Sequence, residues 1–451
     1  MARCLLLLIF ITQVAFPADR PYIDAAKKVA KWLSSTAIQT PHGKVWAADP
    51  NDSTTITTNL YSGSAGIVLF FLEMYHSTGD SQYLAEAQAG ADKLLDVVMD
   101  TDQVREMDYG LYTGVAGLGF TLGEVYAVTK DTRYRKGFRR CAELIRGNAS
   151  PSGNGVAWML HQGDTTYFVT DIISGSSGIG LFLLYASHHL GDLRYREAGV
   201  QAGHCLIEAG QQVPAGMKWA MDAKVPELSP LYRRLMPNFS HGTAGIAFFL
   251  ATLYQETNEK IFLDAAEAGA RYLQSVAMTD SGIACVFHNE PDNRDLFYLG
   301  WCHGPPGTAR LFYRLKQITG DRMWMRWVDR FARTEIQNGI PENRTPGFWN
   351  NVGQCCGSAG IAEFFLDLYA VANKKVHLDF ARRITADLLK RATTDNAGMR
   401  WIQAEHRVRP DLLIAQTGYM QGAAGIGMLL LHLDAWEQGK RGRIVFPDSP
   451  F

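Results

Sequence analysis

The sequence has little net charge, few cysteines and almost no long apolar runs. Its 451 residues carry 44 lysines and arginines against 45 aspartates and glutamates, which gives a formal net charge of −1. This balance provides no electrostatic reason to expect a nucleic acid or an anionic membrane as a partner. Seven cysteines are too few and too dispersed for a disulfide-stabilised scaffold in a chain of this length. The 47% of hydrophobic and 20% of charged residues are instead typical of a globular protein.

The N-terminus carries an apolar run at residues 5–11, which follows Arg3 and is closed by Pro17. This is the length of the central region of a signal peptide and too short to span a bilayer. No other run approaches the roughly 18 apolar residues that a membrane helix needs. We therefore expect residues 1–20 to be a signal peptide or a disordered leader, and residues 21–451 to form a single domain. The protein is expected to be exported, or otherwise cytoplasmic, with no transmembrane segment.

A Gly-x-x-Gly element recurs seven times at intervals of about 50 to 70 residues, and each copy opens an apolar segment. One copy would be a weak signal, but seven at near-regular spacing indicate an internal repeat that covers the whole chain. The first glycines of the seven copies are Gly63, Gly114, Gly175, Gly242, Gly304, Gly357 and Gly422.

Each repeat predicts two helices and a short extended segment. Residues 67–75 and 246–254 are apolar nearly all round, so each predicts a helix that is buried on most faces. A turn such as Thr78-Gly79-Asp80 can end this helix and cap the next, which is amphipathic, as in residues 83–95. Short strand-like segments, with glycine two or three residues before tryptophan, then precede the next copy. They occur at residues 43–46, 155–158, 216–219, 347–349 and 398–401.

The repeats could form an open solenoid or a closed ring. An open solenoid needs polar repeats at its two ends, but the first and last apolar helices match the middle ones in composition. We therefore predict an all-α protein, an (α/α)7 toroid of seven inner and about seven outer helices. The short strand-like loops are expected to lie over one mouth of the ring.

Three cysteines fall one or two positions before the first glycine of a motif and so are expected on the same rim of this ring. Cys302 belongs to the fifth repeat, and Cys355 and Cys356 belong to the sixth. Three thiolates from adjacent repeats suit one tetrahedral Zn²⁺ ion whose fourth position is open to water or substrate. Alternatively, the cysteines are inert buried thiols, or Cys355 and Cys356 oxidise to a disulfide.

Two further residues near this rim are candidates for proton transfer or substrate contact. His241 directly precedes the fourth motif, where a histidine near a metal could act as general acid or base, although a helix cap or a surface residue is the plainer interpretation. Asp171 lies four residues before Gly175 and is the only carboxylate among the seven equivalent positions.

The motifs at residues 240–246, 300–307 and 353–360, together with all seven glycine motifs, resemble those of the lanthionine synthetase C family. The resemblance implies a toroid that binds one zinc ion and adds a cysteine thiol across the double bond of dehydroalanine or dehydrobutyrine. It implies that Cys302 and Cys355 are zinc ligands, and that Cys356 replaces a histidine ligand of the family. It also implies that His241 is the acid or base and that Asp171 lies near the substrate.

The same resemblance implies the partners. The expected acceptor is a dehydrated peptide or protein made by another protein, and a small thiol such as glutathione could be the donor. His303, which follows Cys302, matches the stand-alone and eukaryotic members, and whether Cys356 or His303 is the third ligand stays open. The alternatives are a zinc-containing thiol- or peptide-binding protein without turnover and, ranked last, a carbohydrate-active toroid, which would need paired carboxylates.

Overall fold

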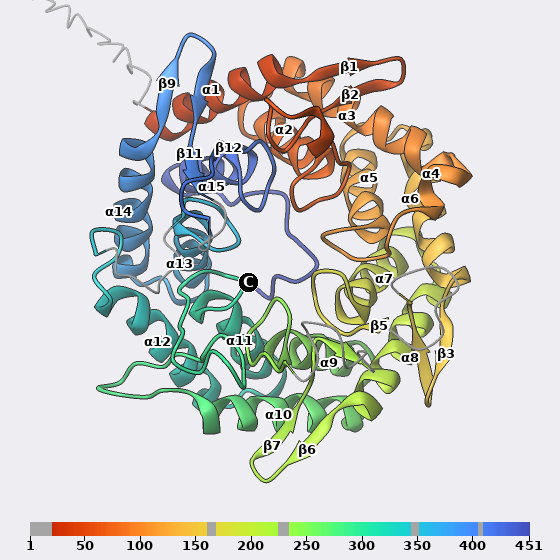
Figure 1. The fold of residues 1–451 in the computed structure, drawn as a ribbon, viewed down its shortest axis with the longest axis vertical. Helices are drawn as coiled ribbons and strands as arrows, with labels where there is room; N and C mark the ends of the chain where they lie inside the picture. The colour runs from red at the N-terminus through yellow and green to blue at the C-terminus, as the bar shows by residue number, and fades with distance from the viewer. Residues whose placement is uncertain (1–19, 160–167, 224–233, 344–350, 405–408) are drawn as a thin grey trace, which may run out of the picture.

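The computed structural model describes residues 20–159, 168–223, 234–343, 351–404 and 409–451. Inner and outer helices alternate along these residues and form a closed double ring (Figure 1). The inner helices are α2 (Ser64–Thr78), α5 (Val115–Thr129), α7 (Ser176–Leu190), α9 (Thr243–Thr257), α11 (Pro305–Thr319), α13 (Ser358–Ala372) and α15 (Ala423–Glu437). The outer helices are α1 (Pro21–Thr36), α3 (Ser81–Met99), α6 (Thr132–Gly147), α8 (Leu193–Ala209), α10 (Lys260–Val276), α12 (Arg322–Gln337) and α14 (Lys375–Arg391).

The ring is closed by the first outer helix. Helix α1 packs against α15, the last inner helix, and α15 packs in turn against α2. Arg20, directly before α1, donates from Nε to Asp434 of α15 over 3.2 Å. The predicted toroid of seven inner and seven outer helices is therefore confirmed. Of the predicted leader, only Arg20 lies within the described residues, and no helix of the described part has the length and apolarity to cross a membrane.

The helix boundaries follow from the turn residues. In α2 every residue from Ser64 to Met74 is buried, as expected for an inner helix that is apolar on all faces. The helix ends at Gly79, which has φ +72°. Asp80 then accepts a hydrogen bond from the backbone N–H of Gln82 and caps α3. Aspartate caps α6, α8 and α12 in the same way.

The second glycine of each motif lies against a loop carbonyl. A Cβ atom at Gly245 would lie 2.1 Å from the carbonyl oxygen of Phe239, and one at Gly360 would lie 2.0 Å from that of Gln354. No side chain fits at such distances, so the loop and the helix can approach only where glycine stands.

We therefore expect Gly245→Ala to lower the free energy of unfolding by about 1–3 kcal/mol, because the added methyl group must displace the loop backbone. Gly147→Ala is the matched control, since a Cβ atom at Gly147 would meet no atom within 4 Å. Urea denaturation of both variants checks this. Equal stability of the two variants would show that the close approach at Gly245 relaxes without cost.

A circle of backbone hydrogen bonds joins the seven loops that precede the inner helices. Each loop donates one N–H to the carbonyl of a neighbouring loop over 2.8 to 3.2 Å, and the last loop bonds back to the first. The circle therefore fixes the rim residues of neighbouring repeats next to one another. Its donor and acceptor pairs are Tyr61–Tyr112, Tyr112–Ile173, Ile172–Ser240, Ser240–Cys302, Cys302–Cys355, Cys355–Met420 and Met420–Tyr61.

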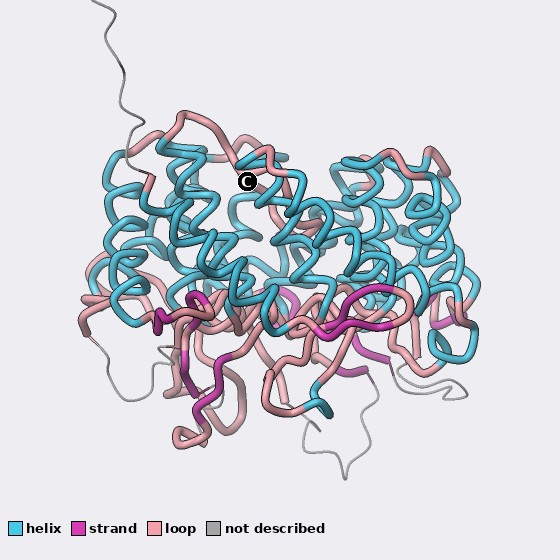
Figure 2. Tube along the Cα trace, turned by 90° about the horizontal axis from the view of Figure 1, so that it is seen from above, coloured by secondary structure: helices cyan, strands magenta, loops and turns pink. Residues whose placement is uncertain are grey.

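The short strands gather at this same end of the ring (Figure 2). Four antiparallel hairpins each follow an outer helix and lie at the outer edge of the ring in Figure 1. They are β1 (Ile38–Thr40) with β2 (Gly43–Val45), β3 (Ser150–Ser152) with β4 (Gly155–Ala157), β6 (Gln211–Val213) with β7 (Gly216–Lys218), and β9 (Thr393–Asp395) with β10 (Gly398–Arg400). Two further pairs are β5 (Phe168–Val169) with β8 (Asp222–Ala223), and β11 (Ile402–Ala404) with β12 (Leu413–Ala415).

A tryptophan fastens each of the four hairpins to its outer helix. Its indole N–H donates over 2.7 to 2.8 Å to a carbonyl 13 residues earlier, near the end of the preceding helix. Each carbonyl belongs to the last turn of its helix, where the regular helical hydrogen-bond pattern ends. The tryptophans are those of the predicted glycine–tryptophan segments: Trp46, Trp158, Trp219 and Trp401. The fifth predicted segment, residues 347–349, lies outside the described residues.

The segment after α15 turns into the centre of the ring (Figure 1). The Glu73 carboxylate of α2 accepts the backbone N–H groups of Arg443 and Ile444 at 3.0 and 3.1 Å. On the other side, the guanidinium of Arg310 in α11 donates to Asp448 over 2.9 Å. The Asp448 side chain is fully buried and that of Arg310 is 14% exposed. The segment thus fills part of the lumen and bridges inner helices that are not neighbours in sequence.

Asp448→Ala is expected to destabilise the protein by about 3 kcal/mol, because it removes the carboxylate partner of the largely buried Arg310 guanidinium. Thermal unfolding monitored by circular dichroism measures the effect. Lys375→Ala is the control, since it removes an exposed ion pair with Asp379 on α14 and should leave the unfolding midpoint unchanged. A midpoint for Asp448→Ala as high as that of the control would show that the last segment contributes nothing to the stability of the ring.

Candidate metal centre

The three rim cysteines lie together at the mouth of the ring. Cys302 ends the loop before α11, and Cys355 and Cys356 end the loop before α13. The Sγ atom of Cys356 is 3.3 Å from that of Cys302 and 3.4 Å from that of Cys355. The backbone bond from Cys302 to Cys355, 3.0 Å long, holds the two loops in this register. The three residues that the sequence places on one rim therefore form one cluster of free thiols.

The cluster fits a zinc ion. Zn–S bonds of about 2.3 Å place the sulfurs of a tetrahedral site about 3.8 Å apart, and these three ligand atoms all lie within 4.8 Å of one another. Among the described residues, these three cysteines are the one group of three or more histidine, cysteine or acidic side chains that lie close enough together to hold a metal ion. His303 does not belong to it, so the geometry favours Cys356 over His303 as the third donor. Three thiolates leave a fourth position open.

The thiols differ in their electrostatics. Burial raises the pKa of the Cys302 thiol well above its usual range. Hydrogen bonds from Cys302 and Cys355 lower the pKa of Cys356 well below its usual range. Cys302 and Cys355 are also almost completely buried, whereas Cys356 is partly exposed. The lowered thiol pKa and the access to solvent therefore both belong to Cys356.

His241 and Asp171 form a second pair on this rim. The Nδ1 atom of His241 lies 2.6 Å from Oδ2 of Asp171, which is fully buried. The other oxygen of Asp171 accepts the backbone N–H groups of Ser174 and Gly175 over 2.8 and 2.9 Å, directly before α7. Because a carboxylate only accepts, Nδ1 of His241 carries the proton, and Nε2 has no hydrogen-bond partner among the described residues. The His241 side chain is 26% exposed, so Nε2 can be reached from the mouth.

His303 packs beside the rings of His241, His288 and Tyr298. Its ring centroid is 4.3 Å from that of His288, and 5.7 Å from those of His241 and Tyr298. Burial, and then the charges of His288 and His241, lower the pKa of His303 well below its usual range. His303 is therefore a neutral ring that packs beside His241.

Two residues near the thiols were not singled out as site residues by the sequence. Gln421 donates from Nε2 to Cys356 Sγ over 3.6 Å and to the Tyr61 hydroxyl over 3.0 Å. Both residues stand directly before a glycine motif or one position earlier, as the cysteines do. The repeat-equivalent position was thus the signal that could have found them, but an amide and a phenol do not stand out as metal chemistry.

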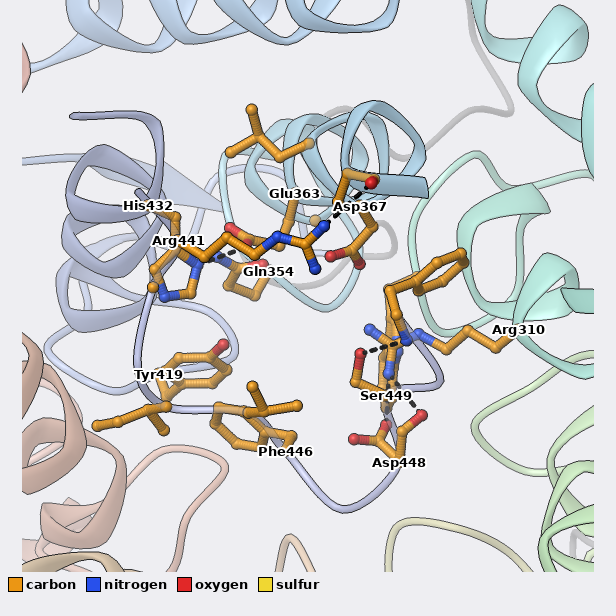
Figure 3. Close-up of a pocket in the computed structure, with 18 of the residues that line it drawn as sticks. Arg310, Gln354, Glu363, Asp367, Tyr419, His432, Arg441, Phe446, Asp448 and Ser449 are labelled. Atoms are coloured by element: carbon orange, nitrogen blue, oxygen red, sulfur yellow. Dashed lines mark hydrogen bonds and ion pairs between the residues drawn. The ribbon is translucent and has the colours of Figure 1, made fainter. Parts of the chain in front are cut away.

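A separate charged cavity of about 140 Å³ lies inside the ring, between α13, α15 and the last segment of the chain (Figure 3). Glu363 pairs with His432, Arg310 pairs with Asp448, and Arg441 donates to the carbonyl of Ala370. None of the cysteines, His241 or Asp171 lines this cavity. The cavity therefore belongs to the anchoring of the last segment and not to the thiol cluster.

The pairing in this cavity predicts a pH dependence of stability. Burial alone would lower the pKa of His432, but the Glu363 carboxylate beside it raises the pKa to about 9. A raised histidine pKa stabilises the fold fully below the unfolded value of about 6.5 and loses this effect as pH rises to about 9. We expect the free energy of unfolding to fall by on the order of 3 kcal/mol between these limits. Urea titrations of wild type and His432→Gln would check this, since only wild type should show the decline.

Two solved structures resemble this architecture, and one protein sequence resembles this chain. Nisin cyclase is similar in structure, with a TM-score of 0.61 at 14% identity over 94% of this chain and 96% of that one. An unsaturated glucuronyl hydrolase specific for heparin also shares the fold, with a TM-score of 0.52 at 12% identity over 94% and 99%. At these identities the likeness concerns the fold alone. A Danio rerio protein named glutathione S-transferase LANCL1 is 23% identical over 337 residues, 73% of each chain.

The family assignment follows from the match of this sequence to a family of known proteins. The sequence model of the lanthionine synthetase C-like proteins matches residues 55–443, which include all seven glycine motifs and the whole thiol cluster. The chain therefore belongs to the lanthionine synthetase C-like protein family.

Proposed function

We propose that this protein is a zinc-dependent enzyme that adds a thiol to a dehydroalanine or dehydrobutyrine residue and so forms a thioether. The observation that carries the proposal is the thiol cluster, which shares its rim with a histidine held by a buried carboxylate. Cys302, Cys355 and Cys356 would hold the zinc ion. When bound, Zn²⁺ supplies a Lewis acid that lowers the pKa of a thiol, so that thiolate is present near neutral pH.

The addition needs one proton to leave the thiol and one proton to reach the α-carbon of the dehydro residue. The thiol releases its proton to solvent, the sulfur forms a bond to the β-carbon, and the π bond of the dehydro residue breaks. The electron pair is left at the α-carbon, which must take up a proton. A protonated His241 would supply it from Nε2, since Nδ1 is committed to Asp171. Asp171 acts through His241, because its carboxylate fixes the ring and stabilises the imidazolium.

The unequal burial of the three cysteines supports one direction from which substrates approach the metal centre. Cys302 and Cys355 are 3% and 4% exposed, so substrates would reach the centre from the side of Cys356 and His241. The neutral His303 ring beside His241 adds an uncharged wall to this side.

The substrates proposed are a dehydrated peptide or protein as acceptor, and either a cysteine of the same chain or a small thiol such as glutathione as donor. The names of two similar proteins, a nisin cyclase and a glutathione S-transferase, motivate these two donors. The chemistry at the centre is the same in both cases, because each donor presents one thiol.

Mass spectrometry of two reactions would test the proposal. A peptide with one dehydroalanine and one cysteine should keep its mass but lose its reactivity toward a thiol-alkylating reagent. A dehydroalanine peptide without cysteine should gain the mass of glutathione when glutathione is supplied. Zinc-loaded protein that accelerates neither reaction above the uncatalysed rate would be a thiol- or peptide-binding protein, and the proposed activity would be wrong.

A further inference from the structure

A chain of side-chain amides connects the loop before α13 with the loop before α15 and ends at the thiol cluster. Asn351 Nδ2 donates to Gln421 Oε1 over 3.0 Å, and Gln421 Nε2 lies 3.6 Å from Cys356 Sγ. Asn351 and Gln421 are 5% and 3% exposed, so water offers them few alternative partners. The arrangement therefore depends on which end of each amide faces its neighbour.

The backbone sets that orientation. The N–H of Gly353 donates to Asn351 Oδ1 over 3.1 Å, which turns Nδ2 of Asn351 toward Gln421. Since Gln421 must then accept with Oε1, its Nε2 group faces Tyr61 and Cys356. Gln403 holds the loops together, because it accepts from Val352 N and donates to the Gln421 carbonyl, each over 2.7 Å. A fixed N–H donor therefore points at the Sγ atom of Cys356.

We infer that Gln421 is a positioning residue that stabilises Cys356 as a thiolate ligand, an inference that rests on the proposed zinc centre. Three thiolates give a zinc site a net charge of −1, and a donated hydrogen bond to one sulfur disperses part of that charge. Partners of this kind orient metal ligands, and their loss typically weakens metal binding by 10- to 100-fold. Asn351 acts one step further out, because it selects the amide orientation of Gln421.

Gln421→Met tests this, because methionine has a similar length but no N–H group. We expect zinc to bind about 10- to 100-fold more weakly in competition with a chromophoric chelator. In Co²⁺-loaded protein, the sulfur-to-cobalt charge-transfer band should move to lower energy, because the thiolate has lost its hydrogen bond. Thr417→Val is the matched control. It removes a buried 2.7 Å bond to the Ala47 carbonyl from the same loop, and it should change neither zinc affinity nor the band.

Asn351→Asp provides a second variant, which alters the chain of side-chain amides without altering any group that touches sulfur. Its new oxygen would face Gln421 Oε1, so the Gln421 amide should turn over and present its carbonyl to Cys356. We expect the same weakening of zinc binding and the same direction of band shift as in Gln421→Met. If Gln421→Met does not fold, Asn351→Asp decides the question alone.

The outcomes separate the two proposals. Wild-type protein that binds zinc tightly, with unchanged affinity and cobalt spectra in both variants, would overturn the role of Gln421 and leave the metal centre intact. Wild-type protein that binds no zinc would overturn the proposed metal centre, and this inference would fall with it.

Discussion

Cys302→Ala is expected to remove most of the zinc, which should be present at about one ion per chain in the wild-type protein. Two thiolates cannot hold Zn²⁺ tightly, and the alanine leaves a gap on the side of α11. Elemental analysis of the purified proteins measures the difference. Cys141→Ala is the matched control, because it removes a buried thiol from the outer helix α6 and should retain the full zinc content.

Full zinc occupancy in Cys302→Ala would show that the metal, if present, is bound elsewhere. Cys356→His gives an independent check of the third position. Imidazole and thiolate both suit a tetrahedral zinc site, so this variant should keep its zinc. Its centre would be one charge more positive, so a bound substrate thiolate would donate its electrons less readily and single turnovers should be slower.

The ring and its thiol cluster could be predicted from the sequence for one physical reason. Equivalent positions of a closed repeat point to the same place, so the residues before Gly304 and Gly357 had to meet once the ring was inferred. The backbone circle shows why this works, because each loop is tied directly to its neighbours at these positions. No knowledge of side-chain conformations was needed to bring Cys302 beside Cys355 and Cys356.

The contacts between unlike positions could not be predicted in this way. Asp171 lies four residues before its motif and His241 lies directly before the next one, and their contact depends on the path of each loop. The last segment has no repeat counterpart at all. Its place in the lumen depends on single charged residues of the inner helices, such as Glu73 and Arg310. A periodic pattern of apolar residues does not predict a role for such charged residues, although they anchor the last segment.

The lumen and the mouth of the ring thus differ in what their polar groups do. In the lumen, charged side chains pair with one another and with the last segment, and their removal should change stability. At the mouth, Cys356 is partly exposed, and within the part of the chain that the structure describes the Nε2 atom of His241 has no hydrogen-bond partner. Substitutions at the mouth should therefore affect chemistry far more than folding.

His241→Gln tests that distinction for the proton donor. Glutamine keeps a polar side chain of similar size that can bond to Asp171, but it cannot transfer a proton near neutral pH. We expect zinc content and the unfolding midpoint to stay as in wild type, while thioether formation on a dehydroalanine peptide slows by about 10²- to 10⁴-fold. Asp171→Asn should slow the reaction as well, because an amide no longer stabilises the imidazolium. Single-turnover rates, measured with the protein in excess over the peptide, isolate the chemical step from product release. A His241→Gln variant that forms thioether at the wild-type rate would show that solvent, and not this histidine, delivers the proton to the α-carbon.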